Sequence, residues 1–277
     1  DLTDKDQIVN KDAVSMLVSL GIIEGKPDGS YAPTENVDRA QMAKMLSVIM
    51  NKGVDNSALY QSVNSGLVDV NTNWAKGHIN YCYTTGIIAG RGNGKFDPSA
   101  TVTALEAAKM LLVAVGYDPK IEGFEGADWA INVSVRADEQ GIFEGFTKDL
   151  SAPLNRDDAA LLIYNALDVE MIQSYTTNNY PIAYSDHRTI LADKYGVIKV
   201  QGVVVANEWA SLASDDGDAA LKEGKTTIYN GEGIFSTTGN TTVSKEDASL
   251  KTQTFNVSTP VDMLGKTVNL YIKKTTI

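Results

Sequence analysis

One short segment occurs three times along this chain. It reads Gly21-Ile22-Ile23-Glu24-Gly25 at its first occurrence, and variants of it return at 86–90 and at 141–145. The first two occurrences are 65 residues apart and the last two are 55 apart. At the 65-residue offset, segment 43–46 also matches 108–111. A period of this length predicts tandem copies of one supersecondary unit, each burying its apolar face only against its neighbours.

Each copy is predicted to fold as a helix, a glycine-rich turn and a second helix. The first helix of copy one has apolar residues at helical spacing, such as Val14, Leu17 and Val18, and it ends at glycine. The expected N-caps of the second helices are Asp38, Thr103 and Asn155, and the residues three positions later are Gln41, Glu106 and Asp158. Thr103 with Glu106 forms a capping box, and Asp38 with Gln41 is close to one.

An arginine follows the N-cap in two of the three copies. Arg39 and Arg156 occupy the first helical position, where a cation is mildly unfavourable because the helix dipole is positive there. We expect no local structural role for an arginine at this position, so both are candidates for contact with a ligand. The alternative for each is a solvated side chain paired with a nearby acid. Copy two has Ala104 in their place.

Together these motifs resemble the S-layer homology repeat. The positions that carry the resemblance are Asp69, Trp74, the segments 86–90, 94–98 and 102–106, and Val37-Asp38-Arg39-Ala40-Gln41-Met42-Ala43, which is similar to the Thr-Arg-Ala-Glu signature of that family. The resemblance extends from residue 1 to about residue 170. It implies a pseudo-threefold spindle, in which one helix from each copy meets in a central bundle and grooves lie between neighbouring copies.

By this resemblance the chain is expected to bind secondary cell-wall polysaccharide, often bearing pyruvate ketals, and so to hold a surface protein on the wall. A pyruvate ketal is a carboxylate on a sugar, which suits a helix N-terminus beside a guanidinium. The expected glycan-binding residues are Arg39, Arg156, Asp4, Asp69, Trp74, Trp129, Thr103, Glu106 and Gln41. The alternative for the tryptophans is core packing, and for Asp4 and Asp69 it is a loop cap.

Some positions depart from the family pattern. Copy three places two aspartates after its arginine, and copy one has Val9 at the tryptophan position. We therefore expect Arg39 first, and Arg156 second, to contact the ligand. Lys44 and Lys109 recur in register, but on helices of this kind we expect exposed residues that favour solubility.

Charge and composition exclude several classes of partner. The formal net charge is -11, of which residues 1–170 carry -10. A sequence-independent nucleic-acid binder needs a basic footprint, and so does a protein that adsorbs to an anionic membrane. No apolar run reaches the length of a transmembrane helix. The single cysteine, Cys82, is expected to be a buried small hydrophobic residue.

Beyond residue 188 the apolar period changes from that of helices to that of strands. The run Val197–Ala206 is rich in β-branched residues, and further strands are expected near 226–229, 234–236, 252–257 and 267–274. We expect a small β-barrel or sandwich. The acidic turn 214–218 could bind Ca²⁺, but it lacks the full EF-hand spacing, so a mobile surface loop is favoured and no cofactor is expected. The last strand runs to Ile277, so we expect the protein to continue.

The sequence offers no catalytic constellation. The two histidines, His78 and His187, fall in different predicted domains, and neither a metal-binding HExxH nor a GxSxG motif is present. We predict a non-enzymatic wall anchor, with self-assembly into a surface lattice as a further option. The alternatives are the anchor of a secreted polysaccharide-degrading enzyme whose catalytic domain lies beyond residue 277, and a protein-interaction scaffold that binds no glycan.

The expected architecture is α+β with several domains. The boundaries are 1–56, 57–120 and 121–170 for the three repeats, 171–188 for a linker and 189–277 for the β domain. The expected location is extracellular, at the cell wall, with Asp1 following a removed leader.

Overall fold

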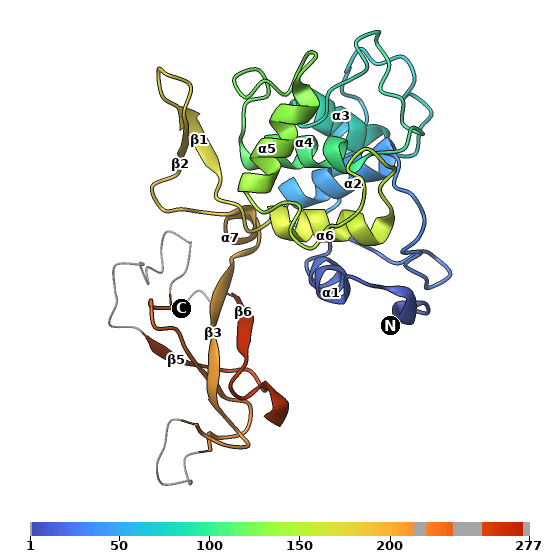
Figure 1. The fold of residues 1–277 in the computed structure, drawn as a ribbon. Coiled ribbons are helices and arrows are strands. Elements are labelled where there is room, and N and C mark those ends of the chain that lie inside the picture. Colours follow the sequence, from blue (N-terminus) through green and yellow to red (C-terminus); the bar gives the residue numbers. More distant parts are fainter. Residues whose placement is uncertain (1, 213–219, 235–250, 274–277) are drawn as a thin grey trace. The chain divides into compact units, whose positions relative to one another are not determined.

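The computed structural model describes residues 2–212, 220–234 and 251–273 (Figure 1). The chain divides into two compact units, Asp1–Tyr184 and Ser185–Ile277, which we call the helical unit and the sheet unit. Mixed helix and sheet agrees with the predicted α+β class. We use copy 1, copy 2 and copy 3 for residues 1–56, 57–120 and 121–170.

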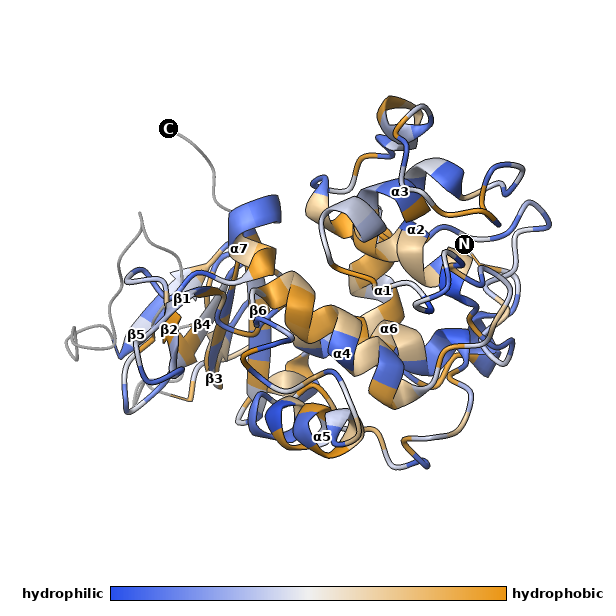
Figure 2. Cartoon of the chain, turned by 90° about the horizontal axis from the view of Figure 1, so that it is seen from above, coloured by the Kyte–Doolittle hydropathy of each residue, from blue (hydrophilic) through white to orange (hydrophobic). Residues whose placement is uncertain are grey.

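The helical unit contains two main helices from each copy. Copy 1 supplies α1 (Lys11–Ser19) and α2 (Arg39–Met50), copy 2 supplies α3 (Lys76–Thr84) and α4 (Ala104–Val115), and copy 3 supplies α5 (Trp129–Glu139) and α6 (Arg156–Ala166). Short 3-10 helices lie at Lys5–Gln7 and Ser57–Tyr60. Helix α4 is largely hydrophobic and lies in the middle of the unit (Figure 2).

The predicted caps begin the second helices. Both bonds of a capping box join Asp38 with Gln41 at the start of α2, and Thr103 with Glu106 at the start of α4. At the start of α6 the Asn155 side chain accepts the N–H three residues further on. These bonds satisfy N–H groups that a helix leaves without intrahelical partners.

The helices pair between copies rather than within them. Helix α3 packs on α2, α5 packs on α4, and α1 packs on α6. Each first helix therefore lies against the second helix of the preceding copy, and the first and last copies meet to close the ring. No copy can bury its apolar face alone, which is the behaviour expected of a tandem repeat.

Three backbone hydrogen bonds join the copies in a closed circuit. The N–H of Val37 donates to the carbonyl of Leu154, that of Leu154 to Val102, and that of Val102 back to Val37, at 2.8, 2.8 and 3.0 Å. Each of these residues directly precedes an N-cap and is nearly inaccessible to solvent. The circuit relates the copies by an approximate threefold pattern, while the spindle implied by the family resemblance stays a prediction.

A hairpin completes the helical unit. Strands β1 (Ile172–Tyr175) and β2 (Pro181–Ala183) pair antiparallel within the segment that we expected to be a linker. The Tyr175 hydroxyl accepts the Asp118 N–H at 2.9 Å and donates to the Glu122 carboxylate at 3.0 Å. These bonds attach the hairpin to copies 2 and 3.

The sheet unit is an open antiparallel sheet. Its elements are α7 (Ile190–Tyr195), β3 (Val197–Asn207), β4 (Thr226–Tyr229), β5 (Thr252–Phe255), a 3-10 helix (Val261–Met263) and β6 (Thr267–Lys273). The strand order is β5-β4-β3-β6, so the described strands form no closed barrel, and the unit also contains a helix. The acidic turn 214–218 and part of the expected strand 234–236 lie outside the described residues.

The core of the sheet unit comes from the period-two pattern of β3. Its buried side chains Ile198, Val200 and Val204 pack with Ile228 of β4 and with Ile234. Strand β3 lies between β4 and β6, and this central position explains why its sequence is the most continuously β-branched of the unit.

Candidate functional site

Two aspartates hold the loops that precede α2 and α4. The Asp69 carboxylate accepts the backbone N–H groups of Phe96 and Asp97 at 2.9 and 2.8 Å, and Asp4 accepts the two equivalent groups of copy 1 at 2.8 Å. These bonds keep the pKa of Asp4 below its usual range. They also fix an unfavourable backbone conformation, since Asp97 and its counterpart Ala32 have φ of 63° and 54°. Asp4 and Asp69 thus hold these loops in place through hydrogen bonds to the backbone.

Arg39 and Arg156 bridge from one copy to the aromatic loop of another. The Arg39 guanidinium lies 4.5 Å from the Phe96 ring centroid, and it donates to the carbonyls of Phe96 and Ala89 at 2.8 and 2.7 Å. Arg156 lies 4.9 Å from the Tyr31 ring and donates to the Tyr31 carbonyl at 2.7 Å. The expectation that these arginines have no structural role is wrong. The neighbouring loop lies against the helix start, so each arginine meets carbonyls and a ring face.

The interface between copies 2 and 3 lacks both members of this pair. Copy 2 has Ala104 in place of the arginine. The Leu105 N–H donates to the Leu150 carbonyl at 3.1 Å, matching the bonds from Ala40 and Asp157 in the other copies. By this register Lys148 is the counterpart of the aromatic residue, and its ammonium group pairs with Asp158. Copy 2 and copy 3 thus depart from the pattern together at this interface, the one without the arginine and the other without the aromatic residue.

A groove of about 420 Å³ gathers residues from all three copies. Copy 1 contributes Arg39, copy 2 contributes the segment 87–91 with Glu106 and Lys109, and copy 3 contributes Phe124 to Gly126 and Trp129. Residues 87–90 of the repeated motif therefore line the same groove as the buried arginine and the half-buried tryptophan. This volume lies within the range of small-ligand sites, about 300–1,000 Å³.

Cations in this groove are partly desolvated. Arg39 is only 4% exposed, and burial, aided by nearby Arg91, lowers its pKa to about 10. Burial also lowers the pKa of Lys109, with Glu125 opposing the shift. Arg91 lies 3.7 Å from the Glu106 carboxylate. Within the described residues no carboxylate lies at salt-bridge distance from Arg39, although Glu106, Asp97 and Asp69 act on its charge from further away.

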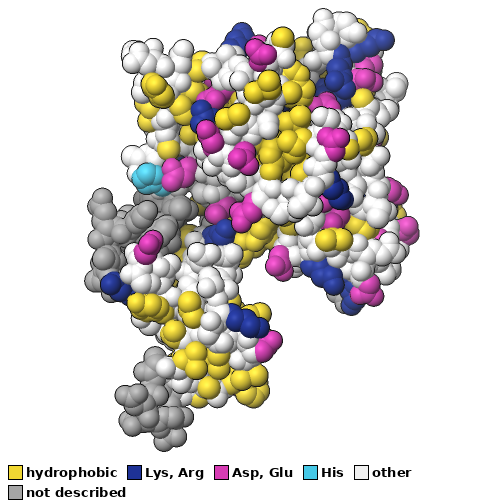
Figure 3. All heavy atoms as spheres, viewed as in Figure 1, with side chains coloured by type: hydrophobic (Ala, Val, Ile, Leu, Met, Phe, Trp, Pro, Cys, Tyr) yellow, Lys and Arg dark blue, Asp and Glu magenta, His cyan; other side chains and the backbone are white. Residues whose placement is uncertain are grey.

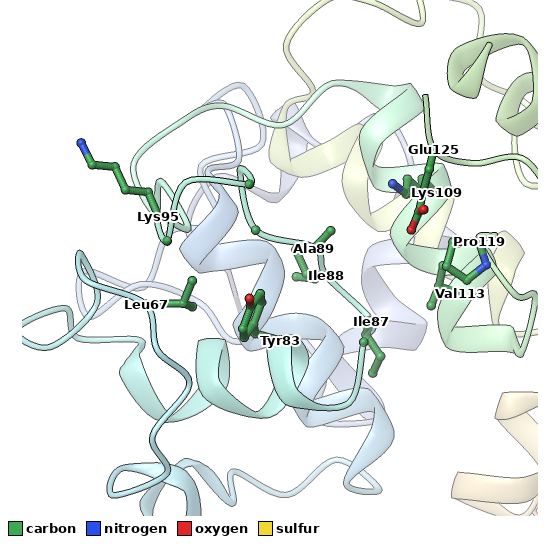
Figure 4. Close-up of a pocket in the computed structure, with 14 residues that line it drawn as sticks. Leu67, Tyr83, Ile87, Ile88, Ala89, Lys95, Lys109, Val113, Pro119 and Glu125 are labelled. Carbon is green, nitrogen blue, oxygen red and sulfur yellow. The ribbon is translucent and has the colours of Figure 1, made fainter. Parts of the chain in front are cut away.

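A second cavity of about 480 Å³ adjoins the groove (Figure 4). The residues lining both are Ile87, Ile88, Ala89, Gly90, Lys109 and Glu125. Beyond them the second cavity is lined by Leu67, Tyr83, Val113 and Pro119, together with glycines of copy 2 and Lys95.

The structure brings together only some of the expected binding residues. Arg39, Glu106 and Trp129 line the groove. Trp74 is 59% exposed and is not among the groove residues, so core packing does not describe it. Thr103 and Gln41 lie in the capping boxes.

Sequence reasoning undervalued Lys109. We expected an exposed residue, yet Lys109 is half-buried and lines both cavities. Its recurrence in register with Lys44 was the available signal. That signal alone could not place the side chain, because the groove is completed by residues 124–129 of another copy.

Comparison with known proteins identifies the repeated unit. The family model of the S-layer homology domain matches residues 1–43 and 68–108. The chain carries S-layer homology domains. Copy 3 lies outside the matched ranges, but its helices α5 and α6 take part in the same cyclic pairing as the helices of the two matched domains.

Relatives of this S-layer homology chain include surface proteins and an enzyme. A cell surface protein of Thermoanaerobacter kivui is 28% identical over 84% of this chain and 28% of its own length. An S-layer protein of Bacillus licheniformis is 33% identical over 41% and 12%, respectively. An amylopullulanase of Thermoanaerobacterium thermosulfurigenes is 30% identical over 57% and 9%. The chain thus spans less than a third of each of these relatives.

In residues 2–212, 220–234 and 251–273, no cluster of three or more His, Cys, Asp or Glu side chains is placed to hold a metal ion. Over the same residues, no helix has the length and apolar character needed to cross a bilayer.

Proposed function

We propose that this chain anchors a protein at the bacterial cell surface by binding a carboxylate-bearing wall polysaccharide, such as a pyruvylated one, in the groove around Arg39. The observation that carries this proposal is that two partly desolvated cations, Arg39 and Lys109, and the half-buried Trp129 line one groove. A carboxylate offsets the cost of burying such cations. A sugar ring provides an apolar face for the indole.

The charge distribution supports recognition at short range. The repeats carry a net charge of -10, which repels an anionic polymer at long range. On the face of the helical unit seen in Figure 3, acidic and basic side chains are interspersed rather than separated by sign. We therefore expect binding to weaken only slightly as salt rises, unlike binding through an exposed basic patch.

Surface and S-layer proteins among the relatives support an anchoring role. The amylopullulanase supports the alternative in which similar repeats anchor an attached hydrolase. The groove would have the same role in both cases. Binding to the wall does not depend on the activity of the anchored protein, so a binding assay tests the anchoring role in both cases.

Co-sedimentation with purified sacculi tests the proposal. Intact sacculi should bind the chain, and sacculi stripped of polysaccharide or of acid-labile ketals should not. Lys109→Gln should weaken binding about tenfold, since it removes one charge from the groove. Lys44→Gln is the matched control: it is the equivalent lysine of copy 1 and lies outside the groove. Binding that survives stripping would contradict the proposal and favour a protein-interaction scaffold.

We further propose that binding requires no metal ion. Chelation with EDTA should leave the amount of sedimented protein unchanged, because the groove cations bind the carboxylate directly. Loss of binding on chelation, restored by Ca²⁺, would instead point to metal-dependent attachment.

A further inference from the structure

We propose that the cavity around Tyr83 is a second saccharide subsite, which holds a neutral sugar ring adjoining the acidic sugar at Arg39 and Lys109. This inference rests on the proposed function, because it extends the same groove. It assigns a role to Tyr83, which the sequence analysis did not single out. It also defines the ligand as at least two linked sugars, with the carboxylate on one and none on the other.

Continuity between the cavities is the first argument. The backbone segment 87–90 and the side chains of Lys109 and Glu125 line both spaces. Figure 4 shows Tyr83 near Ile88 and Ala89, with Lys109 and Glu125 across the cavity. A ligand that leaves the groove past Lys109 therefore enters the space beside Tyr83. Lys109 and Glu125 lie at the junction, where they can bond to sugar hydroxyls.

The packing of Tyr83 is the second argument. The ring, on α3, is only partly buried, and it lies against Gly90. A Cβ on Gly90 would lie 3.2 Å from Cε2 of Tyr83 and 3.2 Å from the carbonyl oxygen of Lys95. Glycine at 90 thus lets the ring lie close to the backbone. An aromatic ring that remains accessible in a cavity can receive the apolar face of a pyranose.

This feature is specific to copy 2. At the repeat offsets, Val18 of copy 1 and Asp138 of copy 3 occupy the position of Tyr83. The same copy supplies Lys109, whereas copy 3 has Leu161 there. Within this chain, the aromatic and the groove lysine that share the site therefore come together only in copy 2.

The remaining lining favours a neutral occupant. Leu67, Val113 and Pro119 are apolar, and the Lys95 side chain points away from the cavity (Figure 4). A second carboxylate would lose its hydration here without gaining a new cation. A sugar ring with hydroxyl groups suits both the apolar walls and the polar junction at Lys109 and Glu125.

Calorimetric titration with two defined probes tests the subsite. One probe is the methyl glycoside of a hexosamine bearing a 4,6-linked pyruvate ketal, and the other is the same unit linked to N-acetylglucosamine. The wild-type chain should bind the disaccharide at least about fivefold more tightly, as expected for one useful aromatic contact. Tyr83→Ala should cancel this difference and leave the affinity for the monosaccharide unchanged. Tyr83→Phe should retain it.

Tyr180→Ala removes an exposed tyrosine from the hairpin and should change neither affinity. Equal wild-type affinity for the two probes overturns the subsite and leaves the proposed function standing. Absence of binding to both overturns the two proposals together. Equal weakening of both probes by Tyr83→Ala, with a lowered melting temperature, assigns the ring a structural role instead and also overturns the subsite.

Discussion

A buried arginine such as Arg39 serves two purposes that are difficult to separate. Its Nε and Nη2 groups satisfy backbone carbonyls of copy 2, which fixes the neighbouring loop. Its charge stays in the groove with no carboxylate at salt-bridge distance among the described residues. Removing Arg39 would disturb both the loop and the ligand site. Within the part of the chain that the structure describes, Lys109 makes no such bridge, so it is the better residue for testing ligand binding.

His78 provides a test of burial through pH. It is 3% exposed, with Nδ1 3.2 Å from the Ser47 hydroxyl and Nε2 3.5 Å from the Asp55 carboxylate. These residue types match a hydrolase triad, but Ser47 is only 1% exposed, so a substrate cannot reach it. Burial lowers the pKa of His78 below the ordinary value of 6.5, despite the opposing effect of Asp55.

The pKa shift gives a signed prediction. Below pH 6.5 the unfolded chain protonates His78 while the folded chain still holds it neutral, so the free energy of unfolding should fall as pH drops through this range. Urea unfolding at about pH 7.5 and about pH 5.5 measures the fall. His78→Gln should make this fall in the free energy of unfolding smaller. An unchanged pH dependence in His78→Gln would show that other groups cause it.

At the scale of elements, helix α3 depends on a close approach between backbones. Gly77 is buried in this helix although glycine is a poor helix former. A Cβ at this position would lie 2.1 Å from the Ser57 carbonyl oxygen. The glycine therefore allows the 3-10 helix Ser57–Tyr60 to lie against α3, and Asn80 reinforces the contact by donating to the Tyr60 carbonyl at 2.9 Å.

Gly77→Ala should destabilise the helical unit. Alanine favours the helix by about 1 kcal/mol, but overpacking against backbone costs about 1–3 kcal/mol, and a contact this short lies at the upper end. Lys76→Ala, one residue earlier in the same helix, should be close to neutral. Urea unfolding followed by circular dichroism measures both. A Gly77→Ala variant as stable as Lys76→Ala would mean that the segment at Ser57 shifts freely.

The sequence predicts elements better than it predicts their partners. The caps at Asp38, Thr103 and Asn155 follow from local chemistry and are confirmed. Helix pairing between copies, and with it the bridging role of Arg39, depends on which copy lies alongside, and a repeat pattern does not encode this. The family resemblance predicted grooves between copies. It did not predict all the residues that line this one, because Lys109 becomes part of it only beside copy 3.

For the whole helical unit, the closure between its first and last copies matters most. Helix α1 packs on α6, and Asn10 at the start of α1 binds the Asp157 carboxylate through its backbone N–H at 3.2 Å and its amide at 2.9 Å. Asp157 is only 4% exposed. The acid that departs from the family pattern in copy 3 thus contributes to closing the ring.

Asn10→Ala should loosen this closure. The substitution deprives a buried carboxylate of an amide donor, which costs about 1–3 kcal/mol. Asn10→Asp should cost more, because it places a second negative charge against Asp157. Lys11→Ala, the next residue along, provides the control. Thermal unfolding of the three variants measures the order, and equal melting temperatures would show that the ring closes without this contact.

The residues that line the groove include Arg39, Ala89 and Trp129, one from each copy. A polymer bound there would contact all three copies at once, so the bound sugar would oppose their separation. A surface anchor works under tension from flow and growth. If the wall polymer occupies this groove, a force on the attached protein would have to break its contacts with the sugar before it could unfold the helical unit. Binding to the wall would thereby increase the mechanical stability of the helical unit.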